Sequence, residues 1–207
     1  MSAAHFARRQ FARHLARYEG LAWAAVATAL ALPAGLIGVV GFDSILAMHP
    51  AQGWAHNPPT RWVSAAWAHA SPPHLQANLL GCGLLAVLGW LAQTRAREAL
   101  AWLLAWPLAN GLLLLDPRLP AFMGASGVLH AGIAVLAVHL LLKGRKALGM
   151  AVLVGLFIKV GFDLSHGLPT YPHPTLGIDV SPLSHLTGTL AGLFFAGILG
   201  ALRPQND

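Results

Sequence analysis

Long apolar runs alternate with short polar connections along most of the chain. Six of these runs are roughly 18–22 residues long, close to the length that a helix needs to cross the hydrocarbon core of a bilayer. None shows the strong period-two alternation of a barrel strand. The pattern therefore predicts an all-α membrane protein built as a bundle of six transmembrane helices. The predicted helices cover residues 21–40, 74–93, 98–115, 124–142, 147–164 and 181–202.

The composition agrees with this pattern. Hydrophobic residues make up 56% of the chain and charged residues only 10%, whereas a soluble domain carries about 25% charged residues. Too few polar side chains are present to cover a globule of this size, so we expect membrane lipid to surround much of the surface. The formal net charge is +6, but the basic residues lie in short clusters between apolar runs. Nucleic acid is therefore not an expected partner.

The positions of the basic residues predict an orientation. Ten of them fall on one side of the six-helix arrangement, whereas only Arg61 and Arg118 fall on the other and Lys159 lies within the fifth run. Because Lys and Arg favour cytoplasmic loops, we expect both termini in the cytoplasm and the protein in the bacterial inner membrane. The ten are Arg8, Arg9, Arg13, Arg17, Arg95, Arg97, Lys143, Arg145, Lys146 and Arg203.

This topology divides the chain into three parts. Residues 1–20 form a basic cytoplasmic segment, residues 21–202 form the membrane domain, and residues 203–207 form a short cytoplasmic tail. The last external loop, 165–180, is rich in proline and histidine, so we predict irregular structure there.

A serine opens the fourth apolar run, within the sequence Gly124-Ala125-Ser126-Gly127. Polar side chains inside apolar helices are costly and often mark function. A serine at a helix start can also cap the free backbone amides, and small neighbours can allow close helix packing. On this segment alone, the structural role is favoured.

A histidine opens the sixth run in a similar way. His185 lies one turn before Gly188, and Gly188 and Gly192 form a GxxxG face that lets another helix approach closely. His185 therefore lies near the same face. Considered alone, it is better explained by an interhelical hydrogen bond than by catalysis.

The two segments together change this interpretation. The fourth and sixth helices both enter the membrane from outside, so Ser126 and His185 are predicted at similar shallow depth. If the glycine face brings these helices together, the imidazole reaches the hydroxyl. A serine is a weak nucleophile until a neighbouring base accepts its proton. The pair is therefore a candidate nucleophile and base.

Donors for an oxyanion are predicted on the second helix. His74 and Asn78 are spaced i, i+4 at its outer start, so both side chains point the same way. The backbone N–H of Ser126, at a helix start, is a further free donor. The alternatives are an interhelical hydrogen bond for Asn78 and an interface position for His74.

Other polar residues are assigned structural roles. His130 shares a helix face with Ser126 and is a rival base, but an interhelical hydrogen bond is the favoured explanation. Lys159 and Asp163 are spaced to pair, yet we interpret them as a snorkelling lysine and an interface acid. The external histidines lack the tight spacing of metal ligands, so we predict no metal and no cofactor. They are His49, His56, His166 and His173.

The motifs together resemble the rhomboid family of intramembrane serine proteases. They are HASPPHLQAN at 69–78, GASG at 124–127, and HLTG at 185–188 followed by Gly192. Their order, on the second, fourth and sixth helices, matches the six-helix core of that family. The resemblance covers nearly all of the chain after its basic N-terminal stretch.

The resemblance implies roles for these residues. It implies a catalytic dyad of Ser126 and His185 with no acidic third member, and an oxyanion hole formed by His74, Asn78 and the Ser126 amide. Supporting positions are Gly124, Gly127, His130, Gly188, Gly192 and a structural His69 in the first external loop. Substrates of the family are transmembrane segments that are cut near the outer face.

Within the family, the sequence around Ser126 and His130 looks most like the rhombosortase branch. That branch is associated with membrane proteins whose C-terminal sorting tail has a glycine pair, an apolar helix and a basic end. Arg61-Trp62 reverses an order common in rhomboids, and Ala131 replaces a glycine frequent in the branch. The alternatives are a general rhomboid protease of other single-pass substrates and an inactive rhomboid-like protein that only binds helices.

A substrate helix must unwind before its carbonyl can be attacked, because helical hydrogen bonds shield the backbone. A glycine pair lowers the free energy of unwinding, since glycine disfavours the helix by about 1 kcal/mol relative to alanine. The resemblance implies that the substrate enters between the second and fifth helices. We expect Gly155 and Gly161 to loosen the packing of the fifth helix there.

Overall fold

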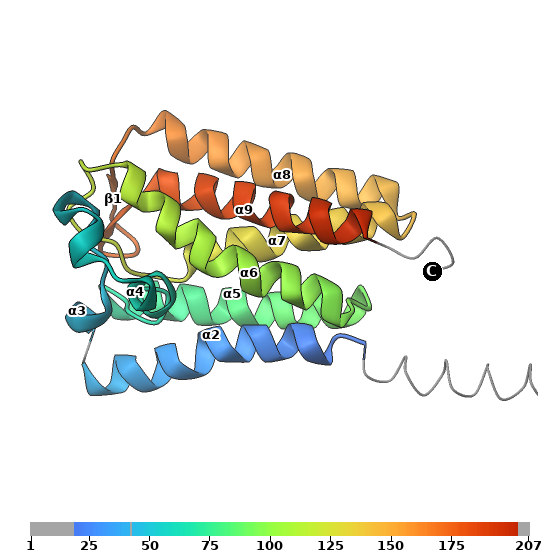
Figure 1. The fold of residues 1–207 in the computed structure, drawn as a ribbon, viewed down its shortest axis with the longest axis horizontal. Helices are drawn as coiled ribbons and strands as arrows, with labels where there is room; N and C mark the ends of the chain where they lie inside the picture. Colours follow the sequence, from blue (N-terminus) through green and yellow to red (C-terminus); the bar gives the residue numbers. More distant parts are fainter. Residues whose placement is uncertain (1–18, 42, 203–207) are drawn as a thin grey trace, which may run out of the picture.

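The computed structural model describes residues 19–41 and 43–202 and consists of long helices that run side by side (Figure 1). The predictions for the basic N-terminal stretch and for residues 203–207 lie outside these residues. The long helices are α2 (Leu21–Val40), α5 (Pro72–Leu91), α6 (Ala96–Gly111), α7 (Ser126–Leu142), α8 (Lys146–Ser165) and α9 (Pro182–Ala201).

All six predicted apolar runs are helical. No predicted boundary differs from the observed one by more than two residues, if the 3-10 turn η3 (Leu112–Leu115) that extends α6 is included. Among the described residues, five helices are long and apolar enough to cross a membrane, which makes the chain a multi-pass membrane protein. The exception is α7, an apolar helix of 17 residues. It is shorter because the chain between α6 and α7 stays irregular up to residue 125 and the helix begins only at Ser126.

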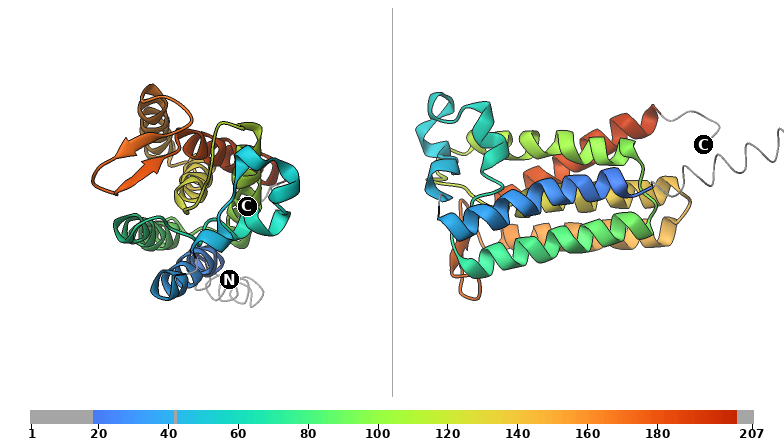
Figure 2. Two further views of the ribbon diagram at one scale, coloured as in Figure 1. Left: turned by 90° about the vertical axis from the view of Figure 1, so that its left-hand side faces the viewer. Right: turned by 90° about the horizontal axis from the view of Figure 1, so that it is seen from below.

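Helix α7 is enclosed by the other long helices. Viewed along the bundle, α7 lies inside a ring formed by the other helices (Figure 2), and it packs against α5, α6, α8 and α9. Buried tryptophans hold this arrangement by donating to backbone carbonyls: Trp23 Nε1 lies 2.7 Å from the Leu85 oxygen, and Trp102 Nε1 lies 2.8 Å from the Val128 oxygen. A residue at the start of α7 is therefore held by helices on several sides.

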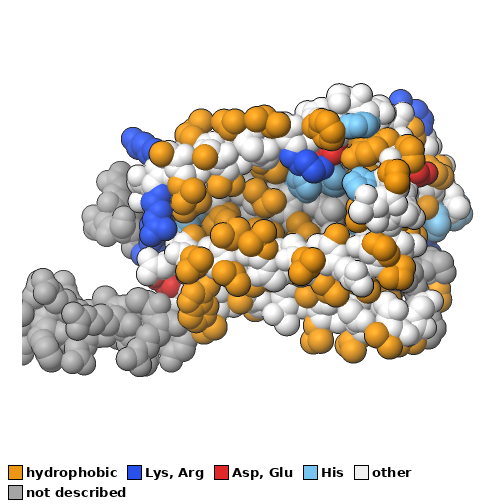
Figure 3. Space-filling view, turned by 180° about the vertical axis from the view of Figure 1, so that it is seen from behind, with side chains coloured by type: hydrophobic (Ala, Val, Ile, Leu, Met, Phe, Trp, Pro, Cys, Tyr) orange, Lys and Arg blue, Asp and Glu red, His pale blue; other side chains and the backbone are white. Residues whose placement is uncertain are grey.

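The outer surface of the bundle is apolar and suits a lipid environment. Large hydrophobic side chains are exposed along α5 and α8, including Leu80, Leu84, Ile158 and Phe162. Figure 3 shows hydrophobic side chains spread along the visible face between its two ends, with a patch of charged and histidine side chains among them. In water such a surface would promote aggregation.

The first described helix begins, and the last ends, at the same end of the bundle (Figure 1). The loop between α5 and α6 and the loop between α7 and α8 also lie there. These loops hold a cluster of basic side chains, and Lys and Arg gather at the left-hand end in Figure 3. We call this the basic end and the other the site end. The clustered residues are Arg95, Arg97, Lys143, Arg145 and Lys146.

Short elements cover the site end. Between α2 and α5 the chain forms helical turns at α3 (Asp43–Leu46), η1 (Pro50–Gln52), η2 (Trp54–His56) and α4 (Pro59–Ser64). Between α6 and α7, Phe122 pairs with Met48 of this segment through backbone hydrogen bonds of 2.8 and 2.9 Å. The strand-like pairing fixes the chain that leads into α7.

The prediction of irregular structure at 165–180 is wrong in part. Strand β1 (Tyr171–His173) pairs antiparallel with β2 (Ile178–Val180), and Tyr171 lies opposite Val180. Both strands are edges of a two-stranded sheet, which tolerates the proline at position 172. The resulting hairpin lies beside the starts of α7 and α9.

Candidate active site

Glycines bring the starts of α7 and α9 into backbone contact. A Cβ atom added to Gly188 would lie 1.9 Å from the carbonyl oxygen of Gly127, and one added to Gly192 would lie 2.4 Å from that of Ala131. Any larger residue would push the helices apart. The GxxxG face therefore packs against α7.

This contact places the side chains of Ser126 and His185 together. Ser126 is the first residue of α7, and Ala125 holds the N-cap position without a side-chain cap. Ser126 is therefore not the capping residue, and its Oγ lies 3.0 Å from Nε2 of His185. The imidazole is 5% exposed. A hydroxyl and a ring nitrogen from two separate helices thus form one hydrogen-bonded pair.

A buried carboxylate lies on the other side of this imidazole. Oδ2 of Asp163, on α8, lies 2.6 Å from Nδ1 of His185, and Asp163 is 0% exposed. The interpretation of Asp163 as an interface acid is wrong. An ionised carboxylate only accepts hydrogen bonds, so Nδ1 carries the proton and Nε2 presents its lone pair to the Ser126 hydroxyl.

Two further groups hold this carboxylate. Nζ of Lys159 lies 2.6 Å from Oδ1 of Asp163, and the Tyr171 hydroxyl donates to the same oxygen at 2.9 Å. Burial, and then the hydrogen bond to Asp163, raise the pKa of Tyr171 to about 12, so the phenol stays a donor. The i, i+4 pairing of Lys159 with Asp163 that the spacing allowed is confirmed, and the lysine side chain is also partly exposed.

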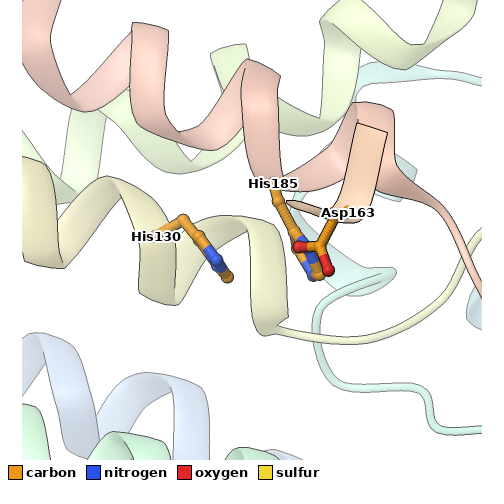
Figure 4. Close-up of side chains that lie close together, drawn as sticks. All are labelled: His130, Asp163 and His185. Carbon is orange, nitrogen blue, oxygen red and sulfur yellow. The ribbon is translucent and has the colours of Figure 1, made fainter. Parts of the chain in front are cut away.

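His130 packs on the base instead of bonding to another helix. Its ring is stacked on that of His185, with centroids 4.1 Å apart and planes at 11°. Its Nδ1 lies 2.7 Å from the Ser126 carbonyl oxygen, within its own helix. The predicted interhelical hydrogen bond is therefore replaced by an intrahelical bond and an interhelical stack. Figure 4 shows His130, Asp163 and His185 converging from three helices.

These three residues have ligand-type atoms within 4.8 Å of one another. Imidazole lone pairs lie in the ring plane, so two parallel stacked rings cannot direct theirs at one ion within the 2.0–2.1 Å that a Zn–N bond requires. The carboxylate is already occupied by Lys159, Tyr171 and His185. The arrangement is explained by hydrogen bonding and stacking.

His74 and Asn78, near the start of α5, lie close to Ser126. Both are buried, and Nδ2 of Asn78 and Nδ1 of His74 have no hydrogen-bond partner among the described residues. They line a cavity of about 560 Å³ together with Ser126 and His185. A buried donor without a partner is unfavourable, and a negatively charged oxygen in the cavity would satisfy it.

Gly124 allows the loop to pass against these donors. Its φ of +124° lies in a region that side chains rarely adopt, and an added Cβ would lie 2.6 Å from Cε1 of His74. His69 buttresses the same ring from the other side, edge to face at a centroid distance of 4.9 Å. Its own Nδ1 lies 3.2 Å from the Trp67 carbonyl oxygen. Gly124 and His69 therefore position His74 within the cavity.

The comparison with protein families adds an independent observation. A family model described as the Rhomboid domain matches residues 56–202, which include α4 to α9. The chain belongs to the rhomboid family. This is a family of intramembrane serine proteases, although inactive members exist. No curated protein matches the chain, and no solved structure matches it either.

In this rhomboid, the surroundings of the histidine depart from what the family resemblance implies. The resemblance implies a serine and a histidine without an acidic partner, whereas here Asp163 contacts the imidazole. The spacing of Lys159 and Asp163 was the only signal in the sequence. It indicates that the two can pair, but does not show which helix they face.

Proposed function

We propose that this rhomboid is an intramembrane serine endopeptidase in which Ser126 is the nucleophile and His185 the base. The observation that supports it most directly is the 3.0 Å contact between Ser126 Oγ and His185 Nε2. His185 takes the hydroxyl proton while Oγ attacks the scissile carbonyl carbon. The same proton then passes to the leaving amine, and water hydrolyses the acyl-enzyme with His185 again as base.

The oxyanion of the tetrahedral intermediate lies, in this proposal, against the side chains of His74 and Asn78 and the backbone N–H of Ser126. In support of this, both residues line the cavity beside Ser126, and Nδ2 of Asn78 and Nδ1 of His74 have no hydrogen-bond partner among the described residues. Donors fixed before the reaction stabilise the developing charge without reorganising. Because the amides in the first turn of a helix have no intrahelical acceptor, the Ser126 N–H is free for this role.

We propose that the site opens toward the periplasm from the bacterial inner membrane. Ser126, His185 and His74 all lie near the starts of helices that begin at the site end, opposite the basic end. Basic loops favour the cytoplasm, so both ends of the membrane domain are placed there. In this proposal α7 is the sixth helix that crosses the membrane, and its first residue lies within the bilayer, beneath the periplasmic membrane surface.

The proposed substrate is a transmembrane helix that enters from lipid between α5 and α8. The main packing partners of α8 are α7 and α9, and an apolar groove of about 380 Å³ lies between α8 and α5 over α7. Within residues 19–41 and 43–202, a Cβ added to Gly155 or Gly161 would meet no atom within 4 Å outside the neighbouring backbone of α8 itself. Photocrosslinkers along α5 and α8 should capture a substrate helix; capture confined to other helices would contradict this route.

Labelling with a fluorophosphonate probe tests the enzymatic proposal. We expect covalent labelling of the wild-type protein in detergent or vesicles and complete loss in Ser126→Ala. Ser165→Ala is the matched control, because Ser165 is exposed and bonds only within α8. Absence of labelling in the wild type, or equal labelling of Ser126→Ala, would instead support an inactive helix-binding protein.

The resemblance to the rhombosortase branch makes a sorting tail the favoured substrate. The test uses a reporter that ends in a glycine pair, an apolar helix and a basic end, beside a version with two alanines. Two glycines disfavour the helix by about 2 kcal/mol, so we expect cleavage up to about 30-fold faster with the glycine pair. Equal rates would favour a general rhomboid protease of single-pass substrates.

A further inference from the structure

A carboxylate buried in a membrane helix needs compensating partners, because the ionised group loses its hydration. Asp163 is fully buried and has three: Lys159, Tyr171 and His185. Oδ1 accepts from the lysine and the tyrosine. Oδ2 faces Nδ1 of the histidine and is also within reach of the lysine. The carboxylate is thereby held in one orientation, with one oxygen directed at the imidazole.

We propose that Asp163 is a positioning residue that holds His185 in the tautomer and orientation needed to accept the Ser126 proton, so that the site operates as a Ser–His–Asp triad. This rests on the proposed function. Asp163 does not touch the reacting atoms; it acts through the imidazole. Lys159 and Tyr171 in turn hold Asp163. Three side chains, from α8 and β1, thereby fix the direction of the Nε2 lone pair of His185 on α9.

The geometry indicates what Asp163 contributes. With a carboxylate at Nδ1, the tautomer protonated at Nε2 would bring two acceptors together at 2.6 Å and is disfavoured. When the imidazole accepts the serine proton, the neighbouring carboxylate also stabilises its positive charge. Lys159 offsets much of that charge, so the larger effect here comes from fixing the tautomer.

A buried carboxylate that served only to join helices would behave differently. Glu98, at the basic end, is such a carboxylate: its Oε1 lies 3.2 Å from Nδ1 of His139. Glu98→Gln is therefore the matched control for Asp163→Asn, because both changes remove the charge of a buried carboxylate beside a histidine and keep its shape.

The first experiment measures the rate constant for fluorophosphonate labelling and, with a cleavable reporter, kcat and KM. We expect Asp163→Asn to lower labelling and kcat by about 100-fold or more with little change in KM, whereas Glu98→Gln leaves both near the wild-type values. A folded Asp163→Asn with wild-type rates would overturn the inference. If the wild type itself is not labelled, the proposed function fails instead.

A double variant separates positioning from structure. Because Asp163 acts through the imidazole, its replacement should have no further effect once the imidazole is gone. We expect Asp163→Asn combined with His185→Ala to label no more slowly than His185→Ala alone. An additional loss of similar size in the double variant would show that Asp163 acts independently of His185 and would contradict the proposal.

Two further measurements cover the case in which Asp163→Asn does not fold. Tyr171→Phe removes one donor from the carboxylate, and we expect labelling to fall about threefold to tenfold, in line with the loss of one hydrogen bond to a charged group. Nitrogen-15 NMR of histidine-labelled wild type, assigned with His185→Gln, should show the Nδ1–H tautomer of His185. Unchanged labelling of folded Tyr171→Phe together with an Nε2–H tautomer would overturn the inference.

Discussion

Two carboxylate–histidine pairs are buried at opposite ends of the bundle, and only one of them lies in a candidate active site. At the site end Asp163 contacts Nδ1 of His185; at the basic end Glu98 lies beside Nδ1 of His139. All four residues are 6% exposed or less. Residue type and burial therefore do not by themselves distinguish a catalytic pair from a structural one.

Both ring nitrogens differ between the two pairs. Nδ1 of His185 is hydrogen-bonded to Asp163 at 2.6 Å, whereas Nδ1 of His139 lies 3.2 Å from Glu98 and has no hydrogen-bond partner among the described residues. Nε2 of His139 lies 3.0 Å from the carbonyl oxygen of Ala92, which has no proton to give. Nε2 of His185 lies 3.0 Å from a serine hydroxyl, which has one. The space around the pairs also differs, since the cavity at the site end is about 560 Å³ and that at the basic end about 10 Å³. Chemistry requires both an acceptor nitrogen facing a hydroxyl and room for a substrate.

The basic-end pair has a structural role that can be described in detail. Oε2 of Glu98 accepts from the Arg95 backbone N–H at 2.9 Å, which satisfies a free amide at the start of α6. Oε1 accepts from Nε of Arg97 at 3.0 Å. The carboxylate thus stabilises the first turn of α6 and contacts α7 through His139, without any contact to a cavity of useful size.

The difference between the two ends is tested most directly by replacing His185 and His139 with alanine, one at a time. We expect His185→Ala to lower the labelling rate of Ser126 by about 10⁴-fold or more, because the base is lost. His139→Ala should stay within about threefold of the wild type per folded molecule, because its ring touches no reacting group. Loss of comparable size in both variants would erase the distinction between the two ends.

The donors in the cavity provide the second test. Asn78→Ala removes an amide whose nitrogen has no partner in the described part of the chain, and we expect kcat to fall about 10²–10³-fold, as for loss of an oxyanion donor. Asn110→Ala is the control, because the nitrogen of that buried amide already donates to the Trp62 carbonyl at 2.7 Å. A larger kinetic effect from Asn110→Ala, after correction for folded protein, would count against the proposed oxyanion site.

The stacked ring sharpens the comparison on the site side. His130→Ala removes the ring that packs on His185, and aromatic stacking contributes about 0.5–1.5 kcal/mol. We expect labelling to fall about threefold to tenfold, far less than in His185→Ala. A loss equal to that of His185→Ala would identify His130 as the base. Stopped-flow or timed gel labelling of both variants decides between them.

The smallest kinetic effect is expected at the basic end. Glu98→Gln should leave the labelling rate per folded molecule within about twofold and lower the free energy of unfolding by about 1–3 kcal/mol, since hydrogen bonds to a charged group are lost. Thermal unfolding in detergent measures the second quantity. If Glu98→Gln is as stable as the wild type but is labelled more slowly, the basic end contributes to catalysis and the distinction between the two ends is wrong.

The helices and the serine–histidine pair were accessible to sequence reasoning for physical reasons. Lipid requires long apolar runs, so the six helices follow from length and hydropathy. Two helices that enter from the same side place their first turns at one depth, and Gly188 and Gly192 require a close neighbour. If that neighbour is the fourth helix, these constraints predict that Ser126 and His185 lie together.

The carboxylate could not be placed in the same way. The spacing of Lys159 and Asp163 shows only that they share a face of α8, and that face is set by packing against α7 and α9. The hairpin that supplies Tyr171 was also missed, because proline at 172 and 174 obscures a short strand. Asp163 was therefore the largest omission, since its role depends on contacts among three segments.

The position of Asp163 on α8 has a consequence for timing. The same helix forms one wall of the apolar groove and carries the acid that holds the imidazole. In the proposed mechanism, a sideways displacement of α8 that admits a substrate helix also moves Asp163 away from His185. Substrate entry and peptide-bond cleavage are then separate steps, and Asp163 holds the imidazole only once α8 has returned.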